Sequence, residues 1–248
     1  MAPETAATVR AHLACLSGKP VAERDVRAVF RSFGRYLVEF FSMHRGPLPG
    51  ANLDDTGSLK ALLAAKQGFI LLTAHLGNWE LGAAWARQMG ARLAVIAMPH
   101  ASARTDRLFS RQRERCGITV LPYRLSGARK ALRWLREGGV VGVLGDLPFD
   151  SQRIQGTLGG LQAELPTGPA WLSRQAGVPL VPSFLIRQAD ERFHFFVESP
   201  IEPMPERDER SDIERMVRLG ALAMEKYMRK YPTQWLVFRR LATSVEMG

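Results

Sequence analysis

The sequence has very little cysteine, and it lacks several motifs that would identify common classes of protein. Only Cys15 and Cys116 occur among the 248 residues, too few for a disulfide framework or a cysteine-based zinc site. No CxxC, HExxH or GxSxG motif is present, so these residues indicate no metal site and no nucleophile-elbow hydrolase. We expect a protein of a reducing compartment that needs no metal.

Long apolar runs are also missing. No stretch of 18 consecutive apolar residues occurs, and the first 30 residues contain no apolar segment followed by a cleavage site. From the sequence we therefore expect no visible export signal and no membrane span.

Lysine and asparagine are scarce, since 28 of the 34 basic residues are arginine and only two asparagines occur. The arginine excess gives a net charge of +10 and a pI of about 10.3. One explanation is a G+C-rich genome. The other is a surface selected for anionic partners, namely nucleic acid, acidic phospholipid, or a phosphorylated or acidic carrier. No Gly-rich nucleotide loop, RNP-like aromatic motif or zinc spacing supports nucleic acid, so we expect no nucleic-acid partner.

Short apolar segments alternate with helical patterns along most of the chain. Strands are expected at 69–74, 92–98, 118–123, 140–146 and 179–188, and helices at 59–68, 78–90, 104–117, 127–139, 168–178 and 211–232. This order predicts an α/β fold: a mixed, mostly parallel central sheet flanked by helices on both faces.

The composition, 46% hydrophobic and 23% charged, is that of a globular protein, and we expect a single domain over 1–248. It comprises an N-terminal helical region at 1–45 and an α/β core at 58–248. The Pro, Gly, Asn and Asp content of 44–58 predicts a loop, and 147–167 is expected to be a loop as well.

Residues 25–45 form a basic amphipathic pattern. Phe33, Leu37 and Phe40 recur at helical spacing, while Arg31 and Arg35 belong to an arginine stripe on the other side. The helix is either docked on the core with a solvated basic face, or an interfacial helix that presses its aromatic side chains into an anionic bilayer. The two interpretations are compatible.

The sequence AHLGNWE at 74–80 places polar residues directly after a predicted buried strand. Gly77 permits a tight turn, Asn78 is a good helix N-cap, and Glu80 falls in the first helical turn. His75 and Glu80 could then face one another, so that the carboxylate holds one ring nitrogen and the other accepts a proton from a substrate hydroxyl. The alternative is a histidine satisfied by the backbone and a glutamate that only caps a helix.

The HLGNWE block does not stand alone. The segments that carry a wider resemblance include TAHLGNWELGA, RTDRLFSRQRERCGITVLP, GGVVGVLGDLPFD, LPTGPAWLSRQAGVPLVPSFLIR and YPTQWLVF. The sequence resembles the bacterial lipid A biosynthesis acyltransferase family over almost its whole length. These late lauroyl and myristoyl transferases belong to the lysophospholipid acyltransferase-like superfamily. The resemblance implies a His-x4-Asp/Glu pair in which His75 is the general base and Glu80 its orienting, charge-stabilising partner. It implies no metal or organic cofactor.

The resemblance implies further substrate-binding residues. Arg113 matches the arginine of an Arg-Glu-x-x-Gly element and would hold a phosphate, a carboxylate or the oxyanion; alternatively it lies on a solvated helix face. Asp146 matches an Asp-Gln pair, although Leu147 replaces the glutamine, and would orient the acceptor, bind an active-site arginine, or simply begin a turn. Thr167 and Gly168 would offer backbone amides to a thioester oxygen, or only cap a helix.

Two departures from the family weaken a specific assignment to lipid A. Met98 and Pro99 stand where the family usually has Arg-Pro, which shifts an expected basic contact, with Arg104 as its candidate replacement. We also expect no hydrophobic N-terminal anchor of the kind that lipid A enzymes usually carry. Asn78 completes the set of expected substrate-binding residues.

The resemblance therefore implies an acyltransferase that moves a fatty acyl group from an acyl carrier protein or coenzyme A thioester to a hydroxyl of a membrane-associated glycolipid or lipid-like acceptor. The thioester is a cosubstrate, and the expected surroundings are an anionic membrane, with peripheral attachment to the cytoplasmic face of the inner membrane. Three alternatives stay open: an amine or secondary-metabolite acceptor, a hydrolase in which water replaces the alcohol, and a non-enzymatic basic membrane-binding protein.

Overall fold

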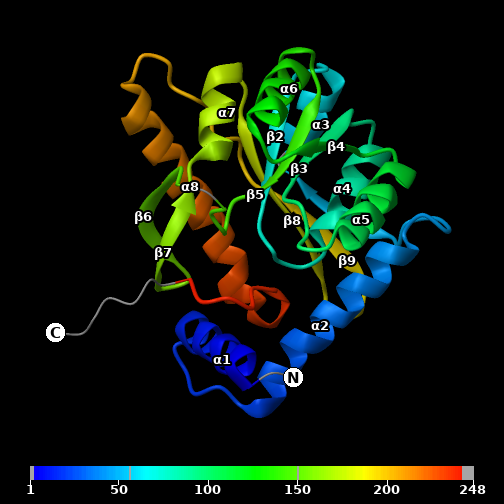
Figure 1. The fold of residues 1–248 in the computed structure, drawn as a ribbon, viewed down its shortest axis with the longest axis vertical. Coiled ribbons are helices and arrows are strands. Elements are labelled where there is room, and N and C mark those ends of the chain that lie inside the picture. Colours follow the sequence, from blue (N-terminus) through cyan, green and yellow to red (C-terminus); the bar gives the residue numbers. More distant parts are fainter. Residues whose placement is uncertain (1–2, 56, 150, 242–248) are drawn as a thin grey trace.

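A seven-stranded, mostly parallel sheet forms the centre of the structure, a computed structural model that describes residues 3–55, 57–149 and 151–241 (Figure 1). The strand order is β1-β9-β8-β2-β5-β3-β4. Strands β8 and β9 are antiparallel neighbours, and the other neighbouring pairs are parallel. The seven strands are β1 (Ala51–Asp55), β2 (Phe69–Thr73), β3 (Leu93–Ala97), β4 (Thr119–Pro122), β5 (Val140–Leu144), β8 (Leu180–Arg187) and β9 (Phe193–Val197).

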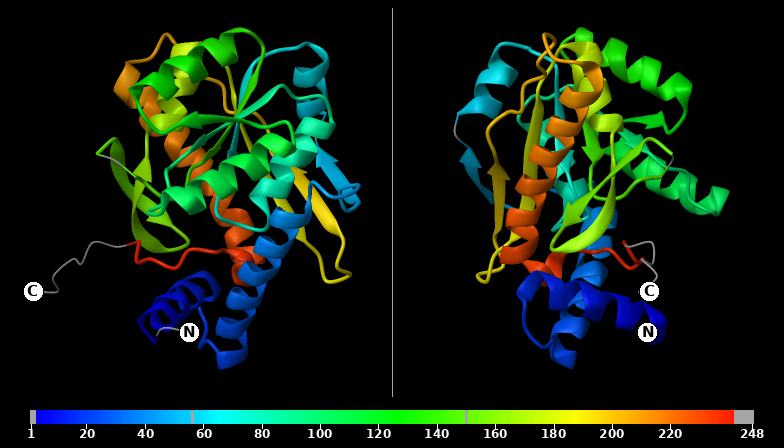
Figure 2. Two further views of the ribbon diagram at one scale, coloured as in Figure 1. Left: turned by 45° about the vertical axis from the view of Figure 1, so that its right-hand side comes forward. Right: turned by 90° about the vertical axis from the view of Figure 1, so that its left-hand side faces the viewer.

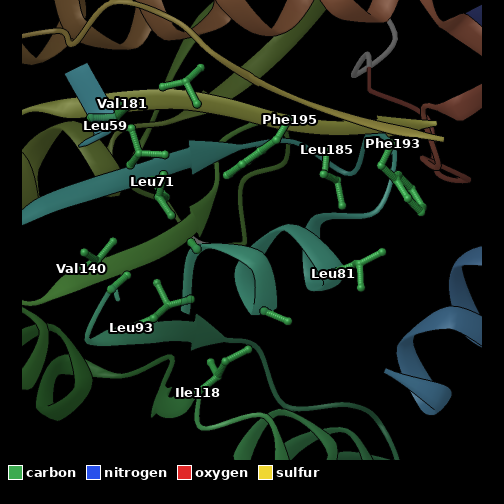
Figure 3. Packing of buried hydrophobic residues seen from close by; sticks show 14 of the residues in the cluster. Leu59, Leu71, Leu81, Leu93, Ile118, Val140, Val181, Leu185, Phe193 and Phe195 are labelled. Atoms are coloured by element: carbon green, nitrogen blue, oxygen red, sulfur yellow. The ribbon is translucent and has the colours of Figure 1, made fainter. Parts of the chain in front are cut away.

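Helices cover both faces of this sheet, as Figure 2 shows from two directions. The helices are α1 (Pro3–Ser17), α2 (Glu23–Ser42), α3 (Ser58–Ala64), α4 (Trp79–Gln88), α5 (Ala103–Arg115), α6 (Leu125–Arg136), α7 (Gly168–Ala176) and α8 (Glu209–Lys230), followed by the short 3-10 helix η1 (Pro232–Gln234). Leu71 of β2 and Leu81 of α4 belong to one buried cluster on one face of the sheet (Figure 3), whereas Ile70 belongs to the cluster on the other face, with Leu135 of α6 and Leu172 of α7. Burial of both faces explains the nearly continuous apolar strands. The predicted α/β fold is confirmed.

Helix α2 is docked on the protein's own core. Phe40 is fully buried and stacks on Phe109 of α5 with ring centroids 5.0 Å apart, and Tyr36 stacks on Trp79 at 4.2 Å. Val38 is 70% exposed on the opposite side of the helix. The aromatic face is therefore covered by protein, as the core-docked interpretation predicts. No helix in the described part of the chain is long and apolar enough to cross a bilayer.

The prediction of a loop at 44–58 was wrong for 51–55, because β1 pairs there in parallel with β9 along its whole length. Its sequence, ANLDD, contains residues that are depleted in strands, but an edge strand with one half-buried face tolerates them.

The prediction of a loop at 147–167 was likewise wrong for 153–158 and 161–166. Strands β6 (Arg153–Leu158) and β7 (Leu161–Pro166) form an antiparallel hairpin there. Gly159 and Gly160 connect them with φ of +65° and +84°, the conformation that a two-residue hairpin turn with the correct twist requires.

Candidate active site

A cavity of about 250 Å³ lies between one face of the sheet and helices α2, α4 and α5. Its inner part is lined by apolar residues such as Leu71, Leu93 and Val95. The residues His75 and His100, which follow β2 and β3, line it at the carboxyl ends of the strands. Ligands of open α/β sheets bind at this edge. The arrangement is an apolar recess with polar groups at one end.

His75 is held by the carboxylate of Asp146. In the sheet Thr73 of β2 pairs with Leu144 of β5, and His75 and Asp146 each follow two residues later. The imidazole Nδ1 lies 2.9 Å from Asp146 Oδ1, and the His75 backbone N–H donates to Oδ2 at 2.9 Å. Asp146 is fully buried, while the His75 side chain is 19% exposed and reaches the cavity.

The surroundings of Asp146 keep it ionised. Burial alone would raise the pKa of this carboxyl, but the adjacent His75 ring and the hydrogen bonds from that ring, from the Trp235 indole and from the His75 backbone together hold the pKa below its ordinary value. An ionised carboxylate can only accept hydrogen bonds, so Asp146 favours the tautomer in which His75 Nδ1 carries the proton and donates it to Oδ1. The other ring nitrogen, Nε2, is then left with a lone pair that can accept a proton.

Glu80 is bound to Arg113 and not to His75, which corrects the expected direct contact of His75 with Glu80. The Arg113 guanidinium donates from Nη2 to Oε1 at 2.5 Å and from Nε to both carboxylate oxygens at 3.1 Å. Glu80 is 3% exposed and the Arg113 side chain 11% exposed, although both border the cavity. The arginine is therefore neither on a solvated helix face nor an unpaired cation.

The turn between His75 and α4 has the predicted form. Gly77 has a φ of +65°, and a Cβ atom there would lie 2.1 Å from the Leu185 carbonyl oxygen, so only glycine fits. Asn78 caps α4, with its Oδ1 accepting the Leu81 backbone N–H at 3.0 Å. Its Nδ2 donates to Glu39 of α2 at 2.7 Å, so Asn78 connects two helices and is 2% exposed.

The remaining predicted residues are not brought together. Thr167 and Gly168 at the start of α7 do not line the cavity, and neither does Arg104, which is exposed in the first turn of α5. The described structure thus gathers His75, Glu80 and Arg113 at the cavity, with Asp146 behind the histidine.

The sequence reasoning missed a second histidine at the cavity. His100 follows β3, its Nδ1 lies 3.3 Å from Asp106 Oδ1, and its ring packs on Phe109 at 4.4 Å. The signal was its position two residues after the predicted strand at 92–98, close to the position that identified His75 after 69–74.

The buried Glu80–Arg113 pair leads to a stability prediction. We expect Glu80→Gln to lower the free energy of unfolding by about 3–5 kcal/mol, because the substitution leaves a buried guanidinium without a counter-charge. Urea denaturation measures the change. The matched control, Arg133→Gln, breaks the exposed Arg133–Glu137 pair, and solvent screening means that it is expected to change the free energy of unfolding far less. Equal effects of the two variants would contradict the prediction.

Comparisons with known proteins agree in the family they indicate. A family model described as bacterial lipid A biosynthesis acyltransferase matches residues 4–243. Two curated proteins of Mycobacterium tuberculosis, from strains CDC 1551 / Oshkosh and ATCC 25618 / H37Rv, are both named phosphatidylinositol mannoside acyltransferase. Each is 28% identical to this chain over an alignment of 189 residues, and the match covers 71% of this chain and 59% of the relative. The chain thus matches somewhat more than half of the length of these relatives.

Proposed function

The chain belongs to the bacterial lipid A biosynthesis acyltransferase family, and from this premise we propose that it transfers a fatty acyl group from an acyl thioester to a hydroxyl of a glycolipid-like acceptor. The observation that carries the proposal is the hydrogen-bonded His75–Asp146 pair at the end of an apolar cavity. The proposal places the reacting thioester beside His75 and the acyl chain in the cavity.

In the proposed reaction His75 is the general base. Its Nε2 takes the proton of the acceptor hydroxyl while the hydroxyl oxygen attacks the thioester carbonyl carbon. The tetrahedral intermediate collapses, the carbon–sulfur bond breaks, and the leaving thiolate takes the proton back from His75. Asp146 holds the ring in the required tautomer and stabilises the imidazolium that forms, as the aspartate of a serine-hydrolase triad does.

The inner part of the cavity suits an acyl chain. Gly142 of β5 lies between Leu71 of β2 and Val95 of β3 in the register of the sheet, and all three line the cavity. A glycine inside a strand weakens it and often marks a site where a ligand approaches closely. We infer that the missing side chain leaves a trough for methylene groups along the sheet.

Gly142→Ala is expected to shift the donor preference to shorter acyl chains. The added Cβ would lie 3.2 Å from Val95 Cγ1 and would fill the trough. Each methylene group of the acyl chain that can no longer be buried in the cavity lowers kcat/KM by roughly fourfold, because burial of one methylene contributes about 0.8 kcal/mol. The measurement is kcat/KM over a series of thioesters of increasing length. The control is Gly34→Ala, where a Cβ meets open space. An unchanged length profile would contradict the trough.

The donor and the location are the further parts of the proposal. An acyl carrier protein or coenzyme A thioester supplies the acyl group, and the acceptor is presented by an anionic membrane, with peripheral attachment at the cytoplasmic face of the inner membrane. The net charge of +10 supports attraction to either anionic partner. Phe149, which is 40% exposed and borders the cavity, offers an apolar contact at its edge.

The test offers labelled acyl carrier protein thioester and acyl-coenzyme A in turn to the purified protein with a lipid extract, and identifies the product by mass spectrometry. Acylated glycolipid is the expected product. An acylated amine or small metabolite would change the acceptor class, and free fatty acid alone would identify a hydrolase. Release of no acyl group from either donor would overturn the proposal.

A further inference from the structure

The Gln234–Trp235 dipeptide, which the sequence singled out, lies against the turn that carries His75. The Gly77 backbone N–H donates to the Gln234 carbonyl oxygen at 2.9 Å, and the Leu236 N–H donates to the His75 carbonyl oxygen at 2.6 Å. We call residues 234–236 the C-terminal clasp. In both views of Figure 2 this red segment lies beside helices α1 and α2, which come from the opposite end of the chain.

The side chain of Trp235 reaches the carboxylate behind His75. Its indole Nε1–H donates to Asp146 Oδ2 at 3.0 Å, and Trp235 is only 3% exposed. The same oxygen accepts the His75 backbone N–H. Two donors therefore fix Oδ2, which leaves Oδ1 directed at the imidazole Nδ1. A buried carboxylate with all of these bonds made has a single preferred orientation.

The clasp is itself held from two sides. The ring of His12 in α1 packs on Trp235 with centroids 5.0 Å apart. The Gln234 side chain donates to the Arg187 carbonyl oxygen at 2.7 Å and accepts the Arg187 N–H at 3.1 Å, which ties the clasp to the end of β8. Packing and hydrogen bonds of this kind fix the rotamers on which a precise active-site geometry depends.

We propose that Trp235 is a positioning residue for acyl transfer: its indole N–H orients Asp146 so that His75 is held in the tautomer and direction of a general base. This rests on the proposed function of His75. Trp235 touches neither substrate nor the reacting atoms, and it does not line the cavity. Its effect belongs to the chemical step and to its pH dependence, not to donor binding.

Trp235→Phe tests the proposal because it keeps an aromatic ring and removes the N–H. We expect kcat to fall about 10- to 100-fold, the size of effect of a lost hydrogen bond to a charged group, with the donor KM unchanged. The pKa of Asp146 rises when it loses a donor to its charged form. The acidic limb of the pH profile, which belongs to the coupled His75–Asp146 pair, therefore moves to higher pH.

Trp134→Phe is the matched control. The Trp134 indole N–H donates to the Arg92 carbonyl oxygen at 2.9 Å, away from the cavity, so the variant also loses one indole hydrogen bond but none to the site. This variant is expected to lose stability but to keep kcat and the pH profile. If Trp235→Phe kept the wild-type kcat and pH profile, or changed both no more than Trp134→Phe does, the positioning role would be overturned.

A spectroscopic measurement separates this proposal from the proposed function. The proton on His75 Nδ1 gives a low-field NMR signal that depends on the position of Asp146. We expect Trp235→Phe to move or broaden that signal in the substrate-free protein, and Trp134→Phe to leave it unchanged. If the wild type transferred no acyl group, the proposed function would fail, whereas an unmoved signal in Trp235→Phe would refute the positioning of Asp146.

Discussion

His75→Ala is expected to lower kcat for acyl transfer by about 10³- to 10⁴-fold, because the variant loses the base that takes the proton of the acceptor hydroxyl. Donor binding is expected to change little, since most of the cavity lining is supplied by other residues. The measurement is kcat and KM with the donor and acceptor identified by product analysis. Loss in kcat without loss in donor affinity would assign His75 to the chemical step.

His194→Ala is the control for a general effect of removing a histidine. His194 lies on β9 and its Nε2 is 2.9 Å from Asn52 Nδ2 on the edge strand β1, outside the cavity lining. It is expected to keep wild-type kcat. If His75→Ala transferred acyl groups as fast as the wild type, the proposed mechanism would be wrong.

The local geometry of the site followed from the sequence because it depends on neighbours in the chain. The turn at Gly77 and the helix cap at Asn78 were predicted correctly, because glycine favours a positive φ and asparagine favours the N-cap position. The histidine after the strand was found for the same reason. The cap contact between Asn78 and Leu81 spans three residues.

The partner of His75 could not be found in this way. Glu80 was favoured because it lies five residues away and because the family that the sequence resembles has a His-x4-Asp/Glu pair, but its carboxylate is bonded to Arg113 of α5. Asp146 is 71 residues from His75 and becomes its neighbour only because β5 inserts between β2 and β3 in the sheet. Strand order is set by the packing of the whole domain, and one sequence does not reveal it.

The same limit explains the role of the C-terminal clasp. Trp235 and His12 come from opposite parts of the chain. The Trp235 indole donates to Asp146, and the His12 ring packs on that indole. The Gln-Trp dipeptide can be noticed in the sequence. Its contact with Asp146, however, depends on how the folded chain places the residue that follows η1. The sequence could therefore identify which residues matter but not which of them act together.

Asp146→Asn is the substitution that decides which carboxylate serves His75, and we expect kcat to fall by about 10³- to 10⁴-fold. In the wild type, Asp146 Oδ2 accepts N–H groups from the His75 backbone and the Trp235 indole. In the variant the asparagine oxygen must take this position, because the amide NH₂ cannot accept these bonds. The asparagine NH₂ then faces Nδ1, which must give up its proton to accept this bond. The ring proton moves to Nε2, and the nitrogen meant to act as base becomes a donor.

The shape of the site changes little in this variant, so the expected loss is in catalysis more than in stability. Nitrogen NMR of the imidazole measures the tautomer directly, and kcat measured below the unfolding temperature gives the rate. Glu80→Gln under the same conditions is the comparison, because its carboxylate binds Arg113 and not the imidazole. If Glu80→Gln lowered kcat as much as Asp146→Asn while the folded fraction stayed the same, Glu80 would be the carboxylate on which the reaction depends. A smaller loss in Glu80→Gln, with the normal tautomer kept, assigns that role to Asp146.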